Sequence, residues 1–371
     1  MQPQYPTAPV GLQASPEMAQ RLAQQVELFL HPLLVWLDAS LDKRLVRTFV
    51  QTVQAILQFR HRAHGLLLSE LGAYLLSPAH APAGTKRLSN LLHSSKWAAS
   101  LIERFLWDQA TTRLNTLAEA EEEALVIWDE SVLEKPESIA AEGLCAVRST
   151  KAARLKRIKP GYFNPPGGRP ICVPGLHWLA LLLLGSKGPP TLALMRWWTT
   201  RGTFATDRRS QEQAVLQQCA TAWGQRVLHV FDRGFAGSPW LGQLFAQQTR
   251  WLVRWPKAYH LVDVQGHARP AWQIARGKKT WERGEVWDGR HHRWRVVGML
   301  ALPVTHPAYP HPLWLVISRP GKGRTPWYLL TNEPIQTAAD AWRLIRAYGR
   351  RWQIEQTWRY SKSEFLFLGG E

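Results

Sequence analysis

Near the C-terminus, four residues that could act on a phosphate group recur at fixed gaps. Tyr348, Arg351, Glu355 and Lys362 are spaced Y-x2-R-x3-E-x6-K, with one glycine and no proline between them. At about 100° per residue of α-helix, these positions fall within roughly 60° of one another on one face. A carboxylate suits a divalent metal, and flanking Arg and Lys suit the phosphates of a nucleic acid. The pattern predicts metal-dependent cutting or joining of DNA; the alternative is a solvated helix face with ordinary charges.

Two further acids follow short apolar runs upstream. Asp129 comes after residues 124–128 and Asp232 after residues 227–231, and both runs are typical of buried strands. Ligands of open α/β sheets lie outside the carboxyl ends of the strands, so both aspartates would project into one crevice. Either one alone could be a turn or helix-cap residue. Glu130 is a rival for the first acid that only geometry can separate from Asp129.

Together these segments resemble the DDE transposases of the insertion sequence four class, in which the Tyr-Arg-Glu-Lys spacing is a signature. The family's other two motifs open with D-E or D-S and with D-R-G, and Asp129-Glu130-Ser131 and Asp232-Arg233-Gly234 match them. The resemblance implies that Asp129, Asp232 and Glu355 are catalytic and hold two Mg²⁺ or Mn²⁺ ions. Such a pair of ions, about 3.5–4 Å apart, could activate the attacking oxygen and stabilise the leaving oxygen at phosphorus.

The resemblance also implies DNA contacts and a fold. Arg351 and Lys362 would clamp phosphates, Tyr348 would hydrogen-bond or stack beside them, and Arg254 would lie close to the DNA backbone. The expected fold is α/β, an RNase H-like catalytic core with a β-rich insertion, preceded by an all-α N-terminal domain. The partners would be double-stranded DNA, as transposon terminal inverted repeats and as target, with the protein acting as a homodimer.

The composition agrees with a polyanionic partner. Lys and Arg number 46 against 28 Asp and Glu, which gives a formal charge of +18. A chain this basic should bind nucleic acid through counterion release and weaken steeply with salt. We expect phosphate contacts from two basic groups, although a charge run is often only a solvated surface. The first group contains Lys156 and Arg157 with Arg148, Lys151, Arg154, Lys159 and Arg169, and the second contains Arg196, Arg201, Arg208 and Arg209.

The length of 371 residues predicts two or three structural units. Residues 1–118 read as a helical DNA-binding domain, or equally as a plain helical bundle, with an interruption near Pro32. Residues 119–255 read as the first part of the catalytic core, 256–332 as the β-rich insertion and 333–371 as the closing part. One closing helix is expected from Thr337 to about Phe367. The core elements expected are strands 125–129, 144–148, 176–184, 191–197, 227–231 and 250–254, with helices 208–223 and 238–248.

Other features bear on the compartment and on activity. Three scattered cysteines without a C-x-x-C pair suit a reducing cytosol. The longest apolar run, Leu176 to Leu184, is far short of the roughly 20 residues of a membrane helix, so we expect a soluble cytoplasmic protein without a membrane partner. Family members continue beyond the point where this chain stops, which suggests a shortened C-terminus. A truncated DNA-binding regulator and a simple metal-dependent nuclease are therefore the alternative functions.

Overall fold

A computed structural model describes residues 16–58, 68–136, 143–149, 161–164, 171–288, 293–321 and 325–359. The chain divides into two compact units. The first unit comprises the described residues up to Phe105, and the second comprises the described residues from Leu106 onward. Each unit has its own hydrophobic cluster.

The described residues of the first unit form helices and no strands. Leu37, Leu41 and Val46 form its buried cluster. Two helices of this unit approach at Gly84, where an added Cβ would lie 2.0 Å from the carbonyl oxygen of Gly72. The first helix continues through Pro32, so the expected interruption there is wrong; the chain turns only after Asp38. The helices are α1 (Pro16–Asp38), α2 (Lys43–Gln58), α3 (Leu68–Leu75), α4 (Ala81–Leu92) and the start of α5 (Ala99–Glu119), with a 3₁₀ turn at Pro78–His80.

The second unit is built on a mixed sheet of 12 described strands. The strand order is β2-β3-β1-β5-β6-β12-β11-β10-β7-β8, with β4 paired to β3 and β9 paired to β10. Only the β1–β5 and β5–β6 pairs are parallel among the pairs described. The bounds are β1 (Ala124–Glu134), β2 (Cys145–Arg148), β3 (Cys172–Leu184), β4 (Thr191–Trp198), β5 (Val227–Phe231), β6 (Arg250–Arg254), β7 (His260–Val262), β8 (Ala268–Pro270), β9 (Glu282–Asp288), β10 (Arg293–His306), β11 (Tyr309–Pro320) and β12 (Trp327–Thr331).

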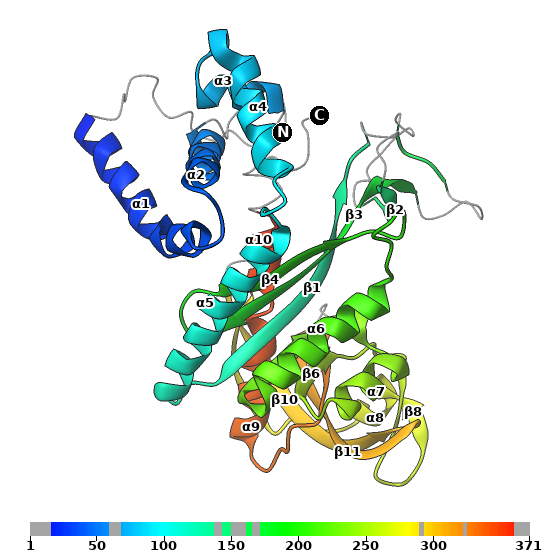
Figure 1. Cartoon of the computed structure of the whole chain (residues 1–371). Helices are drawn as coiled ribbons and strands as arrows, with labels where there is room; N and C mark the ends of the chain where they lie inside the picture. The colour runs from blue at the N-terminus through cyan, green and yellow to red at the C-terminus, as the bar shows by residue number, and fades with distance from the viewer. Residues whose placement is uncertain are drawn as a thin grey trace, which may run out of the picture. The chain divides into compact units, whose positions relative to one another are not determined.

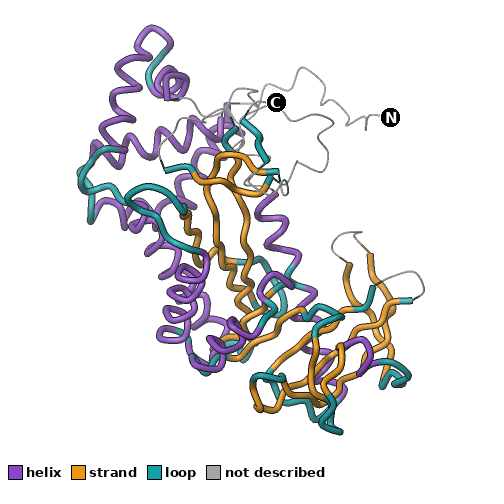
Figure 2. The backbone as a smooth tube through the Cα atoms, turned by 90° about the vertical axis from the view of Figure 1, so that its right-hand side faces the viewer, coloured by secondary structure: helices purple, strands orange, loops and turns teal. Residues whose placement is uncertain are grey.

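Helices cover both faces of this sheet (Figure 1; Figure 2). Alternate residues of β1 enter two different clusters, because successive side chains of a strand point to opposite faces. Val126 and Trp128 pack with α6 (Arg208–Ala222), α7 (Ser238–Ala246) and the second part of α5. Leu125 and Ile127 pack on the other face with α9 (Ala338–Gly349) and α10 (Trp352–Arg359). The sheet therefore separates an α6 face from an α10 face.

Two expected elements differ from the structure, and one short helix was not expected. The strand expected at 125–129 runs on to Glu134, because β3 pairs with it along its whole length, from Leu125↔Leu184 to Glu134↔Gly175. The single closing helix is broken, since α9 ends at Gly349 and α10 begins at Trp352. The strands of the β-rich segment join the central sheet through the β12–β6 pair, and a short helix, α8 (Ala271–Ala275), follows β8.

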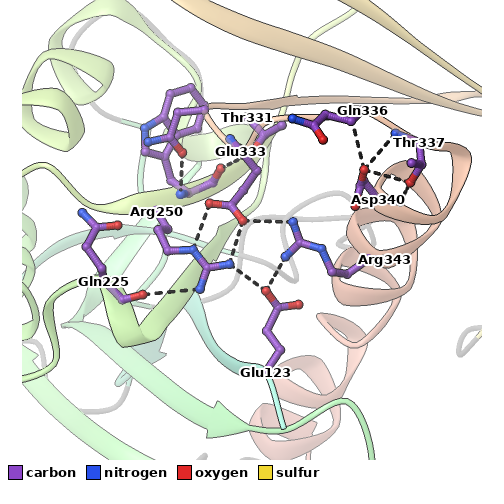
Figure 3. A network of polar contacts seen from close by, with 11 residues as sticks. Glu123, Gln225, Arg250, Thr331, Glu333, Gln336, Thr337, Asp340 and Arg343 are labelled. Carbon is purple, nitrogen blue, oxygen red and sulfur yellow. Dashed lines mark hydrogen bonds and ion pairs between the residues drawn. The ribbon is translucent and has the colours of Figure 1, made fainter. Parts of the chain in front are cut away.

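A network of ion pairs ties the start of β1 to β6, the end of β12 and α9 (Figure 3). Arg250 contacts Glu333 at 2.6 Å and Glu123 at 2.8 Å. Arg343 contacts Glu333 at 3.0 Å and also pairs with Glu123. All four side chains are at least partly buried, so this end of the sheet is fixed by complementary charges.

No helix in the described part of the chain combines the length and the apolar character needed to cross a bilayer.

Candidate active site

Asp129 lies in β1, and Asp232 directly follows the neighbouring strand β5. The parallel β1–β5 register pairs Val126 with His229 and Ile127 with Val230. Continued by two residues, this register places Asp129 beside Asp232, and neighbouring strands lie about 4.8 Å apart. Asp129 shares the α10 face with Ile127, and Asp232 follows Val230 at the same two-residue period. Both acids therefore belong to the α10 face of the sheet.

The carboxylate of Asp129 is held in a largely buried position. Burial raises the pKa of Asp129 to about 6; the Arg351 charge opposes this shift and the Asp232 charge adds to it. The indole Nε1 of Trp358 donates a hydrogen bond to Oδ2 at 2.9 Å, and Arg351 Nη1 lies 4.0 Å from Oδ1. One hydrogen bond, from Trp358, and the more distant charge of Arg351 thus orient this acid on the α10 face.

Arg351 joins this pair to Glu355. Its guanidinium forms an ion pair with Glu355, one turn further along the chain, while facing Asp129. Burial works against the charge of Arg351, but Tyr348 and the carboxylates of Asp129, Glu355 and Asp232 raise its pKa above the usual value. The side chain of Glu355 is 58% exposed and opens onto a cavity of about 580 Å³. Arg351 is therefore the counter-ion shared by the acids of this face.

The donor set fits a hard divalent cation in part. No three His, Cys, Asp or Glu residues among those described are grouped as metal ligands. Asp129 and Asp232 offer adjacent carboxylates, and Mg²⁺ is often held by one or two carboxylates plus waters and phosphate oxygens. Glu355 is linked to Asp129 through Arg351, with which it forms an ion pair. Glu355 could become a metal ligand if a cation replaced Arg351 as its partner.

Geometry separates Glu130 from Asp129. Glu130 follows in the strand, so its side chain points to the α6 face, away from Glu355. There its Oε2 lies 2.5 Å from Nη2 of Arg208. Burial raises the pKa of Glu130 to about 7, with the Arg208 charge acting in the opposite direction. The arrangement favours Asp129 as the first acid.

The structure does not place the predicted aromatic and basic residues on one continuous helix face. Tyr348 is only 4% exposed, because it belongs to α9 and its ring packs 5.0 Å from that of Trp327. The guanidinium of Arg254 lies 6.0 Å from the centre of the Tyr348 ring, and Arg254 lines the same cavity as Glu355. Lys362, Lys156 and Arg157 lie outside the described residues.

Two members of the second basic group expected from the sequence already have an acidic partner within the protein. Arg208 and Arg209 both form ion pairs with Glu212, whose side chain is fully buried, at 2.9 and 2.7 Å. For these two residues the expectation of phosphate contacts is not supported, because their charges are already matched within the protein.

One residue of the site and one contact were missed in the sequence. Trp358 lies three positions after Glu355 on α10, so helical spacing could have placed it beside the acid. Nothing in the spacing could have paired Arg208 with Glu130, because the contact depends on how α6 packs on the sheet.

The sequence matches a transposase family model over part of its length. Residues 204–368 match the family model described as "Transposase DDE domain". The matched segment includes Asp232, Arg351 and Glu355 but not Asp129. No curated protein matches the sequence. The solved structure of the piggyBac transposase synaptic complex with hairpin DNA aligns with a TM-score of 0.40 and 12% identity, over 86% of this chain and 59% of that one. The chain thus spans under two thirds of that solved chain, and a likeness this distant establishes no common fold.

Proposed function

We propose that this chain is a DNA transposase that cuts DNA at the ends of a mobile element and joins the freed 3′-end to target DNA. The observation that carries the proposal is the side-by-side placement of Asp129 and Asp232 on the face where α10 presents Glu355. The match of residues 204–368 to a transposase DDE domain supports the same activity. The Tyr-Arg-Glu-Lys spacing favours the insertion sequence four class.

An RNase H-like core is part of this proposal. The first strand, β1, is antiparallel to β3 and parallel to β5, and β6 continues the parallel part. Helices lie on both faces, with two of the three acids at the ends of parallel pairing. This arrangement supports the RNase H-like core that the resemblance predicts.

Asp129, Asp232 and Glu355 would be the ligands of two Mg²⁺ or Mn²⁺ ions. When bound, the ions would supply the positive charge needed for an in-line displacement at phosphorus. Trp358 orients Asp129 through its indole N–H. When no metal ion is bound, the charge of Arg351 neutralises the acids. Arg351 could also turn to a DNA phosphate, which its planar guanidinium can bind with two hydrogen bonds.

The formal charge of +18 supports DNA as the partner. In this proposal the protein acts as a homodimer on two copies of the terminal inverted repeat. Arg254 and the exposed Glu355 would meet the DNA at the cavity that they share.

A strand-transfer assay tests the proposal. A labelled, pre-cut terminal repeat with a free 3′-hydroxyl is incubated with a supercoiled target plasmid and Mg²⁺ or Mn²⁺, using the wild type and Glu355→Ala. Covalent joining of the label to the plasmid, lost in the variant, supports a transposase. Metal-dependent cutting without joining would point to a nuclease, and binding without either reaction would point to a DNA-binding regulator.

A further inference from the structure

One guanidinium on the α6 face contacts a neighbour of each aspartate, Glu130 in β1 and Gly234 in the turn after β5. Arg208 is the first residue of α6, which is capped by Asp207. Its Nη2 lies 2.5 Å from Oε2 of Glu130 and 3.5 Å from the carbonyl oxygen of Gly234. Its Nε lies 2.9 Å from Oε1 of Glu212. A single planar group thus joins β1, the turn after β5 and α6.

Both outer contacts are next to an acid of the site. Glu130 directly follows Asp129 in β1. Gly234 belongs to the 3₁₀ turn Arg233–Phe235, and its N–H donates a hydrogen bond to Oδ1 of Asp232 at 2.6 Å. Arg208 therefore contacts, from the α6 face, a residue next to each aspartate.

Glu212 fixes the guanidinium in this position. Its side chain is fully buried, and its two oxygens are occupied by Arg208 and Arg209 at 2.9 and 2.7 Å. The guanidinium carbon of Arg208 also lies 5.5 Å from the centre of the Phe235 ring. The Glu212 carboxylate and the Phe235 ring therefore restrict the movement of the Arg208 guanidinium.

We propose that Arg208 is a positioning residue that sets the spacing of Asp129 and Asp232 through Glu130 and Gly234. This inference rests on the proposed function, because the spacing matters only if the two aspartates share a ligand or substrate. The geometry depends on the planar fork. A lysine has one ammonium group and cannot hold Glu130, Glu212 and Gly234 in the same fixed arrangement.

Arg209 provides a matched control. Arg208 and Arg209 each donate to one oxygen of Glu212, so either substitution leaves Glu212 with one arginine. Among the described contacts, Arg208 reaches Glu130 and Gly234, whereas Arg209 contacts neither of them. The comparison of Arg208→Met with Arg209→Met therefore isolates the effect of the contacts to Glu130 and Gly234.

Two measurements on the full chain test the proposal. The first is amide hydrogen exchange of the turn at 232–236 without DNA or metal. We expect exchange to be at least about 10-fold faster in Arg208→Met and unchanged in Arg209→Met, because the turn loses its anchor. The second is nicking of terminal-repeat DNA as a function of Mg²⁺ concentration. We expect Arg208→Met to lose on the order of 100-fold in rate and to need more Mg²⁺ for half-maximal rate, with Arg209→Met within about 3-fold of wild type.

The outcomes separate this inference from the proposed function. Unchanged exchange in Arg208→Met would overturn the positioning role, whether or not the wild type cuts DNA. Faster exchange in a protein that never cuts DNA would support the positioning role and contradict the transposase. If Arg208→Met fails to fold, Arg208→Lys decides: faster exchange at 232–236 supports the role, and wild-type behaviour in both measurements contradicts it.

Discussion

Trp358 donates a hydrogen bond from its indole Nε1 to Oδ2 of Asp129, although the two residues are 229 positions apart. The Trp358 ring meets that of Trp178 edge-on at 4.0 Å, and Trp178 stacks on Trp197 at 4.1 Å. The donor is therefore held by a row of aromatic rings. This contact links the last described helix to the central strand of the proposed active site.

Trp358→Phe should preserve the ring contact and remove the donor. The hydrogen bond from Trp358 lowers the pKa of Asp129, against a larger rise from burial. Without it the pKa should rise above about 6, so the acidic limb of the pH–rate profile should move to higher pH. We expect about a 10-fold loss of nicking rate near pH 6.5 and partial recovery at pH 8.5. Trp272→Phe, on the exposed side of α8, is the control, and identical profiles for Trp358→Phe and wild type would contradict the role of the donor.

Asp129→Asn should stabilise the fold at alkaline pH. Burial raises the pKa of Asp129 from 3.8 to about 6 in the folded protein, so folding favours the protonated form. The stabilisation linked to this proton is complete below pH 3.8 and is lost as the pH rises through 6. The amide removes this penalty, which amounts to about 3 kcal/mol at pH 8. Urea unfolding at pH 8 and pH 4 measures it: a gain at pH 8 that vanishes at pH 4 is expected, and equal stability at pH 8 would refute the burial argument.

Arg250→Met should destabilise the protein by about 2–3 kcal/mol, because it leaves Glu333 and Glu123 with one partner fewer at the end of the sheet. Burial opposes ionisation of Glu333, but hydrogen bonding to Arg250 and the charges of Arg250 and Arg343 lower its pKa below the ordinary value. Its contribution is therefore present above pH 4.5 and is lost as the pH falls through the lowered pKa, so the variant and wild type should converge in acid. Urea unfolding checks this, with the exposed Arg283→Met expected within about 0.5 kcal/mol of wild type.

Glu355→Gln should leave stability within about 0.5 kcal/mol of wild type. The Glu355 side chain is 58% exposed, and an ion pair so open to solvent contributes little to folding. Thermal unfolding of the two proteins measures this directly. A loss above 1 kcal/mol would mean that the Arg351–Glu355 pair is structural, and any loss of activity in the variant would then have a second cause.

The sequence identifies elements best where local pattern and tertiary pairing agree. Strands 227–231 and 250–254 were predicted with the observed bounds, because apolar runs end in polar residues there. The extension of β1 beyond Asp129 was missed, because Asp129-Glu130-Ser131 reads as a turn and only the pairing with β3 keeps it extended. The break after Gly349 was missed because a single glycine in a helical pattern is often tolerated.

The sequence could place the three acids on strands and a helix, but not their partners. Burial of Tyr348 follows from the packing of α9 on the sheet, and the helix-face argument treated that helix as continuous with α10. The contacts of Asp129 with Trp358 and of Glu130 with Arg208 join distant segments. Such pairs depend on tertiary packing, which residue spacing does not encode.

The most direct test of the account is nicking of end-labelled DNA that carries the flanking inverted repeat, with Mg²⁺ or Mn²⁺. Wild type is compared with Asp129→Asn, Asp232→Asn and Glu355→Gln, and with DNA binding measured in parallel. The account predicts metal-dependent nicking at the repeat end by the wild type and a loss of at least about 1,000-fold in each variant, with binding retained. Nicking that persists in any of the three variants, or a wild type that binds the repeat and never nicks it, would contradict the proposed active site.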